Sequence, residues 1–492
     1  MKIYKILNNT AAVLAALAIA SCAELEEKPE SSMVSQQFYN TEADAVAAVN
    51  AVYADLNPSG QSIYNSLFQI GVEMATDDYM AGPRARNAHV RAISSLIHDP
   101  SNDRMQELWR QSYALIKDAN AAIDHIAEIP ATNISEEKRQ RTINEAKFLR
   151  ALNYFNLVRW FGDVPLVLHE ISTLDAGHLN VVQATEAEVY AQIEQDLKDA
   201  ENLPSVYPAS DLGRATSGAA KTVLSKVYLT QKKWEQAAQK AKEVIDEGNY
   251  RLFDDYADVF SVDKENTVEH IFSIQFKGNA NFRGNSLASR SAPYEPEGVN
   301  GDYADELNVA GGLFQSYRPE DRRLGINFIT QMVSPVNGKL YVLSEPHFYM
   351  YYDHSVVGAQ GQSSINLPLI RYAEVLLIYA EALNEIEGPS AVAYDAVDQV
   401  RRRAGIPALA EIEPNLSQEA FRDSVFEERR KEFVYQYHRW FDLVRRGADY
   451  YIKTLTAAGK PNAAPRHLHF PIPQREIDLN PNLKQNPDWV NY

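Results

Sequence analysis

The sequence predicts a mainly α-helical protein in which paired helices form a repeat scaffold and a long, loop-rich insertion lies over it. Two observations support this prediction. Segment 367–405 contains two amphipathic helices joined by a tight turn, whereas segment 277–366 has no helical periodicity. A chain of 492 residues that is 45% hydrophobic is also long enough to bury a large core.

The helical hairpin at 367–405 is the clearest element of the chain. Apolar residues recur at three- and four-residue steps on both sides of the turn at Gly388 and Pro389, so each set occupies one helix face. Gly405 and Pro407 then supply a left-handed cap and a block to further helix. Two helices joined by so short a turn should pack antiparallel.

Further helices are expected from Thr41, from Asp103 and from Ser135, with another pair between Ser217 and Tyr250. That pair spans about one tetratricopeptide period of roughly 34 residues, and its run KVYLTQKKWEQAAQKAKEVIDEG looks like such a repeat. One helix pair cannot bury its apolar face alone. Three or four irregular stacked units are therefore predicted, forming a tetratricopeptide-like scaffold.

The insertion at 277–366 differs in composition from the rest of the chain. It holds ten of the 22 glycines together with seven tyrosines. A long irregular segment within a folded domain is usually functional, because loops supply binding residues on a rigid scaffold.

The first residues predict export and lipid anchoring. Lys2 and Lys5 precede an apolar run at 11–20 that is too short to span a bilayer. The sequence Ile-Ala-Ser-Cys then ends at Cys22, the single cysteine of the chain, in the pattern of a bacterial lipobox. Cleavage before Cys22 would leave a residue that carries acyl chains. The alternative is an ordinary secretory signal with an incidental cysteine.

The charge of the chain excludes some partners. Its formal net charge of −18 disfavours nucleic acid and anionic lipid surfaces, since neither would be attracted to so acidic a body. A single cysteine also excludes an intramolecular disulfide framework. The polar, acidic run after Cys22 reads as a solvated tether.

Three later motifs resemble the SusD/RagB family, the surface lipoproteins of Bacteroidota that capture nutrients for a TonB-dependent transporter. They are RYAEVLLIYAEALNE followed by RRRAGIP, ERRKEFVYQYHRWFDLVRRG at 428–447, and FPIPQREIDLNPNLKQNPDW at 470–489. Members of that family typically read Glu-Gly where this chain has Gln436 and Tyr437. The resemblance implies a SusD-like fold and export to the outer face of the outer membrane.

The expected organisation is a signal peptide at 1–21, a lipidated tether at 22–40 and one SusD-like domain at 41–492. Within that domain, the parts are a helical scaffold at approximately 41–276 and 367–450, a ligand-binding insertion at approximately 277–366 and an extended segment at approximately 451–492.

No motif predicts catalysis, a cofactor or a metal. A cluster of charged residues on a helix predicted at 417–446 could form an acid and base pair, but a ladder of ion pairs on the helix surface is favoured. Its members are Glu427, Glu428, Arg429, Arg430, Lys431, Glu432, Arg439, Asp442, Arg445 and Arg446. The run RHLHF is expected to be extended, so His467 and His469 could face the same way and bind a metal. The sequence has no third metal ligand at a recognisable spacing.

Two patches could bind a ligand through rings and planar hydrogen-bonding groups. All five tryptophans lie in framework segments, so a stacking surface must use other rings. The loop at 75–91 offers Asp77, Asp78, Tyr79, Arg84, Arg86 and Asn87. The insertion offers Phe282, Asn285, Arg290, Tyr294, Tyr303 and Tyr341. In the resembled family the ligand surface draws on a corresponding early loop and on the central insertion. The alternative is that either patch is simply solvated loop.

The resulting prediction is a non-catalytic lipoprotein that holds an oligosaccharide or polysaccharide fragment and passes it to a SusC-type TonB-dependent transporter. Three alternatives stay open: the same fold binding peptides, a polysaccharide-degrading enzyme, and a pure scaffold. The sequence does not name the sugar or its linkage.

Overall fold

The computed structural model describes residues 38–173, 175–278, 283–299, 301–356 and 358–492. The leader, Cys22, most of the tether and Phe282 lie outside the described residues. Within the described ranges, no helix combines the length and apolar character needed to cross a membrane.

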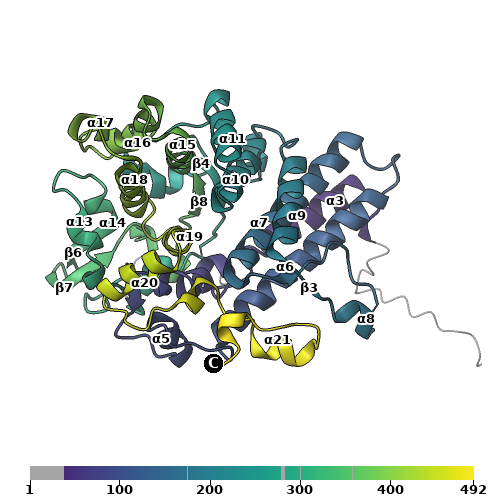
Figure 1. Ribbon diagram of the computed structural model, residues 1–492, viewed down its shortest axis with the longest axis horizontal. Coiled ribbons are helices and arrows are strands. Elements are labelled where there is room, and N and C mark those ends of the chain that lie inside the picture. The colour runs from purple at the N-terminus through teal and green to yellow at the C-terminus, as the bar shows by residue number, and fades with distance from the viewer. Residues whose placement is uncertain (1–37, 174, 279–282, 300, 357) are drawn as a thin grey trace, which may run out of the picture.

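A series of helices, most of them packed on their neighbours in the sequence, forms the scaffold (Figure 1). Contacts run from α6 to α7, α9, α10 and α11, and then across the insertion to α15, α16 and α18. The predicted helical-repeat fold is confirmed. The long helices are α3 (Glu42–Ala54), α6 (Asp103–Glu128), α7 (Glu136–Phe161), α9 (Glu186–Ala200), α10 (Ser217–Thr230), α11 (Trp234–Glu247), α15 (Tyr372–Glu387), α16 (Ala391–Arg403) and α18 (Gln418–Glu432).

The helix boundaries follow local chemistry. The hydroxyl of Thr41 accepts from the backbone N–H of Asp44 while the Asp44 carboxylate accepts from the backbone N–H of Thr41, which closes a capping box on α3. Gly248 ends α11 in the left-handed conformation, at a φ of 67°. Helix α9 was not predicted, although Thr185 caps it in the same way as Thr41 caps α3.

The insertion is more regular than its composition suggested. The two strands that flank it pair with each other, because β4 (His270–Ile274) lies antiparallel to β8 (Leu367–Arg371). Strands β6 (Phe328–Val333) and β7 (Leu340–Phe348) form a hairpin within it. The short helices and remaining strands are α4 (Phe68–Gly71), α5 (Ala88–Ser94), α8 (Ala176–Leu179), α12 (Leu287–Ser291), α13 (Leu313–Ser316), α14 (Leu324–Asn327), α17 (Leu409–Ile412), α19 (Arg439–Arg445), α20 (Ala448–Ala457), α21 (Gln474–Leu479), β1 (Tyr79–Ala81), β2 (Val164–Pro165), β3 (Gln183–Ala184) and β5 (Asp305–Leu307).

The predicted continuous helix at 417–446 is wrong. Helix α18 ends at Glu432 and α19 begins at Arg439, because Tyr435 and Tyr437 between them adopt positive φ values of 59° and 68°. Tyr437 stands where the resembled family has glycine, the residue that adopts such values without strain. Its buried ring stacks on Phe68 at 4.6 Å, which holds the unusual backbone in place.

The carboxy-terminal segment is also less extended than predicted. Helix α20 enters it and α21 lies within it. His467 and His469 do not alternate along a strand, since His467 is buried in a 3₁₀ turn and accepts from the backbone N–H of Ala464 at 3.0 Å. Among the described residues, no group of three or more His, Cys, Asp or Glu side chains could hold a metal ion.

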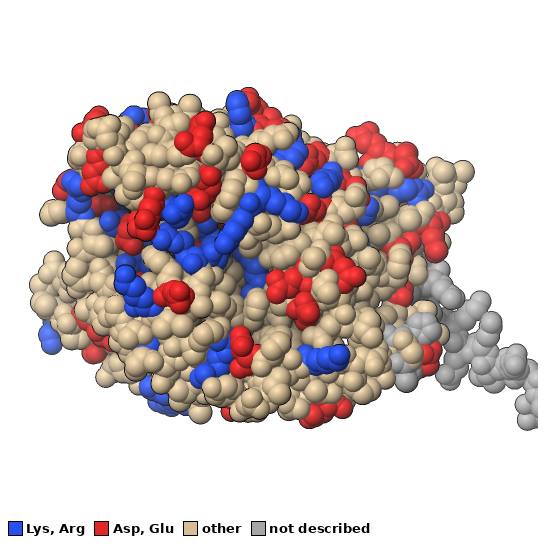
Figure 2. Space-filling view, viewed as in Figure 1, with Lys and Arg blue, Asp and Glu red and all other residues tan. Residues whose placement is uncertain are grey.

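The charged cluster of α18 is not the predicted surface ladder, because its main members are buried. Glu432 lies at the centre, between the guanidinium groups of Arg323 in the insertion, Arg371 of β8 and Arg403 of α16. Arg323 also pairs with Glu428 at 2.6 Å. On α19, Asp442 pairs with Arg429 at 2.8 Å. Figure 2 shows Lys and Arg gathered in a band near α18 and α19, and acidic side chains over the side of α6, α7 and α9.

Burial alone would raise the pKa of Glu432, since an isolated charge is costly to remove from water. Arg403, Arg371 and Arg323 outweigh that effect and lower the pKa to about 2. The carboxylate is therefore ionised at neutral pH and neutralises part of the positive charge of three arginines.

We predict that Glu432→Gln destabilises the protein by about 3–5 kcal/mol at pH 7, because three buried guanidinium groups lose a shared partner. Chemical denaturation monitored by circular dichroism measures the change. Asp423→Ala is the control, since Asp423 pairs with Arg446 but is 54% exposed and should cost less than about 1 kcal/mol. Equal costs for the two variants would contradict the central role of Glu432.

Candidate functional site

Two segments that are far apart in the sequence meet over one cavity. The early loop at 75–91 contains β1, and β1 pairs antiparallel with β5 of the insertion. The pairing continues beyond the strands, where the backbone N–H of Gly82 donates to Ala304 at 2.8 Å. A Cβ atom on Gly82 would lie 2.5 Å from the carbonyl oxygen of Tyr303, so only glycine allows this approach.

The cavity between these segments has a volume of about 320 Å³. Its walls are formed by the early loop, the start of α6, α4 and the stretch from α12 to β5. A cavity of this size suits a sugar unit or a similar small group. The charged side chains that line it are Arg84, Arg86, Arg104, Arg290, Asp302 and Asp305.

Arg84 lines the cavity, and Tyr294 of the insertion lies beside Arg84 without lining the cavity itself. The guanidinium carbon of Arg84 lies 4.5 Å from the centre of the Tyr294 ring. That ring is 48% exposed. A guanidinium group is attracted to the face of an aromatic ring. The pair therefore presents a planar hydrogen-bond donor next to an aromatic surface.

Asn87 and Arg290 complete the set of predicted residues at the cavity. The side-chain oxygen of Asn87 caps α5 by accepting from the backbone N–H groups of His89 and Val90, at 2.8 and 3.3 Å. Arg290 extends from α12 and donates from Nε to the hydroxyl of Ser286 at 3.3 Å. Arg84, Arg86, Asn87 and Arg290, which the sequence placed in two patches, thus line one cavity, and Tyr294 lies next to it through its contact with Arg84.

Asp305 forms part of the floor and is almost completely buried. Its Oδ2 accepts from Gln69 and from the hydroxyl of Tyr435, whereas its Oδ1 has no hydrogen-bond partner among the described residues. Burial raises the pKa of Asp305 to about 6, although Arg290 acts in the opposite direction. The free Oδ1 can accept a hydrogen bond from a ligand hydroxyl.

Three predicted residues of the early loop are bound into the framework instead. The carboxylate of Asp77 pairs with Arg439 at 2.7 Å, and that of Asp78 pairs with Arg430. Tyr79 is buried and stacks on Phe348, with 4.5 Å between the ring centres. None of the three lines the cavity.

The other predicted residues of the insertion also lie apart from the cavity lining. Asn285 is buried, and its Nδ2 donates to the carbonyl of Ile365 at 2.7 Å. Tyr303 is 5% exposed, donates to Glu345 and packs on His347. Tyr341 lies on β7 with the ammonium of Lys339 over its ring at 4.9 Å.

Sequence reasoning missed Arg104, Asp302 and Asp305. Asp302 and Asp305 flank Tyr303, so their proximity to a named residue was a usable signal. No signal in the sequence could place Arg104, because its position at the cavity depends on how α6 packs against the early loop.

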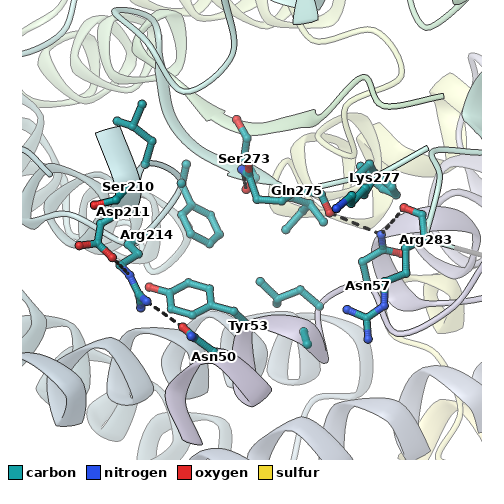
Figure 3. A pocket seen from close by; sticks show the side chains of 17 residues that line it. Asn50, Tyr53, Asn57, Ser210, Asp211, Arg214, Ser273, Gln275, Lys277 and Arg283 are labelled. Atoms are coloured by element: carbon teal, nitrogen blue, oxygen red, sulfur yellow. Dashed lines mark hydrogen bonds and ion pairs between the residues drawn. The ribbon is translucent and has the colours of Figure 1, made fainter. Parts of the chain in front are cut away.

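A larger cavity of about 520 Å³ lies between α3, the loop before α10 and β4 (Figure 3). At one end of it, the charged and amide groups bind one another. Arg214 is held by Asp211, Asn50 and Glu145 at 2.8–2.9 Å. Asn57 donates to the backbone carbonyl of Arg283 at 3.2 Å and so fastens α3 to the insertion. These contacts mark a structural junction, whereas the smaller cavity keeps unpaired donors and acceptors.

A helical-repeat scaffold that presents a polar, ring-edged cavity beneath a long insertion defines a class of ligand-binding proteins. Comparison with known sequences is more specific. Residues 344–489 match the SusD family, and residues 25–229 match a family described as "Starch-binding associating with outer membrane". The chain belongs to the SusD/RagB family.

Relatives cover nearly the whole chain. SusD-like protein P2 of Formosa agariphila is 29% identical, over 99% of each chain. The structure of a laminarin binding SusD-like protein is 26% identical, with a TM-score of 0.76 over 91% of this chain and 100% of that chain. A SusD superfamily protein from Parabacteroides distasonis is 25% identical, with a TM-score of 0.77 over 93% and 100%.

We predict that two tyrosines of the insertion, Tyr303 and Tyr294, contribute very differently to stability. Tyr303→Ala should cost roughly 2–4 kcal/mol, because it removes a buried ring and the donor to Glu345. Tyr294→Ala should cost less than about 1 kcal/mol, because that ring is half exposed and contacts chiefly Arg84. Thermal and chemical unfolding of both variants, compared with the unmodified protein, measures the difference. Equal destabilisation by both changes would contradict the assignment of Tyr303 to the framework.

Proposed function

We propose that the protein is a non-catalytic, cell-surface glycan-binding lipoprotein and that the cavity between the early loop and the insertion is its ligand site. The observation that carries the proposal is the convergence of Arg84, Asn87 and Arg290 at this cavity, with Tyr294 beside Arg84 and a free oxygen of Asp305 on the floor. The laminarin binding relative and the starch-binding description of the matching family support a glycan as the ligand.

The groups at the cavity suit a sugar in their chemistry. The exposed ring of Tyr294 offers an apolar face for the C–H side of a pyranose, worth about 1 kcal/mol beyond the area it buries. The guanidinium groups and Asp305 offer donors and an acceptor for hydroxyls, each adding a net contribution of about 1 kcal/mol. A few such contacts give dissociation constants in the micromolar to millimolar range. Such affinity suits a protein that must release its ligand to a transporter.

The partner we propose is a SusC-type TonB-dependent transporter in the outer membrane. Cys22 would be lipidated after removal of 1–21, and 22–40 would tether the domain at 41–492 to the extracellular face. The outer-membrane description of the family that matches residues 25–229 supports this location. The broad outer surface of the stacked helices would provide the contact area for the transporter.

We predict that one or more polysaccharides retard the protein in native gels and that Tyr294→Ala reduces the retardation at least about fivefold, since a stacking face is lost. Tyr341→Ala is the matched control, because the ring of this other partly exposed tyrosine lies against Lys339, which does not line the cavity, whereas the ring of Tyr294 lies against Arg84, which does. Loss with Tyr341→Ala but not with Tyr294→Ala would move the site to the β6–β7 hairpin. No retardation by any polymer would overturn the proposal.

We also predict that the lipidated protein co-purifies with one outer-membrane transporter from gently solubilised membranes. Mass spectrometry of the affinity-purified material identifies the channel. Cys22→Ala tests the anchor, because the variant should leave the membrane fraction. Purification of the lipidated protein without any channel would contradict the proposed partnership.

A further inference from the structure

We infer that the glycan bound at this cavity is anionic and carries carboxylate or sulfate groups. The inference rests on the proposed function and adds the substrate class. Four arginines and two aspartates line the cavity, so its formal charge is positive in a chain whose net charge is −18. A local reversal of sign against so acidic a background favours a ligand of negative charge.

Three of these four arginines differ in pairing from the buried arginines of the framework. Arg323, Arg371 and Arg430 each have a carboxylate oxygen within 2.8 Å. Within the part of the chain that the structure describes, Arg84, Arg86 and Arg290 have no carboxylate oxygen within 4.0 Å. Arg104 pairs with Asp103 at 3.3 Å, so it is the one lining arginine that already has an acidic partner.

One of these unpaired groups is also partly withdrawn from water. The Nε of Arg84 is buried and has no hydrogen-bond partner among the described residues, and its guanidinium carbon lies 4.5 Å from the centre of the Tyr294 ring. A desolvated donor without a partner is unfavourable. A neutral sugar hydroxyl would satisfy one N–H but leave the charge uncompensated, whereas a carboxylate or sulfate satisfies two N–H groups and the charge together.

The two aspartates offset only part of the charge of the four arginines, so the formal charge of the site stays positive. Asp302 is exposed, and Asp305 is held on the floor by Gln69 and Tyr435. No ion pair within 4.0 Å joins either of them to another described residue. The arrangement therefore offers cations at the walls for the acidic substituent and one acceptor at the floor for a hydroxyl of the same sugar unit.

The test compares three polymers by isothermal titration calorimetry on the full chain in detergent: neutral laminarin, polygalacturonate as a uronate polymer, and carrageenan as a sulfated polymer. We expect one of the two anionic polymers to bind at least about tenfold more tightly than laminarin, with an affinity that falls as salt rises. Which of the two binds distinguishes a carboxylate from a sulfate. Tighter binding of laminarin would overturn this inference while keeping the proposed function. Binding of none of the three, nor of any polymer in the native gels, would overturn both.

Arginine variants locate the effect. Arg84→Gln, Arg86→Gln and Arg290→Gln should each weaken binding of the anionic polymer about tenfold or more, since each removes a charged hydrogen-bond donor. Arg251→Gln is the control, because it removes the same charge at a site that is 62% exposed and does not line the cavity. Arg86 is exposed, so its variant tests the site without risk to folding. Equal weakening by the control would overturn the inference.

Discussion

The set of ion pairs centred on α18 is the constraint on which the rest of the structure depends. Glu432 holds Arg323 of the insertion, Arg371 of β8 and Arg403 of α16. On the same helix, Arg430 pairs with Asp78 of the early loop and donates to the carbonyl of Gly311 in the insertion at 2.7 Å. One scaffold helix thus fixes both segments that form the cavity. Directed charge pairs of this kind specify position more strictly than apolar packing does.

The break after α18 continues this connection toward the cavity. Tyr435, at a positive φ, donates to Asp305 on the cavity floor and packs on Tyr79 and Phe348. A regular helix would carry this ring away from the floor, so the backbone strain at the break has a structural use. The framework residues Asp77, Asp78 and Tyr79 consequently support the site from behind, although they do not line it.

The sequence predicted the helical scaffold well because helix periodicity, caps and turns are local signals, as at Thr41, Ser135 and Gly388. It predicted the charged cluster of α18 poorly, since burial of Glu432 depends on partners that lie 29 to 109 residues away. The two ligand patches were named from composition. Only the pairing of β1 with β5 shows which members of each patch face each other and which belong to the framework.

The early loop illustrates why residue type alone could not separate these roles. Asp78 and Arg84 stand six residues apart and look equally suited to bind a sugar. Asp78 is paired with Arg430, whose charge it neutralises, so a ligand would have to compete with a buried ion pair. The guanidinium of Arg84 contacts the ring of Tyr294 and, among the described residues, has no carboxylate oxygen within 4.0 Å. A ligand would therefore compete only with water for this group. The charge that a framework leaves uncompensated is therefore a better guide to a binding site than the number of polar groups in a loop.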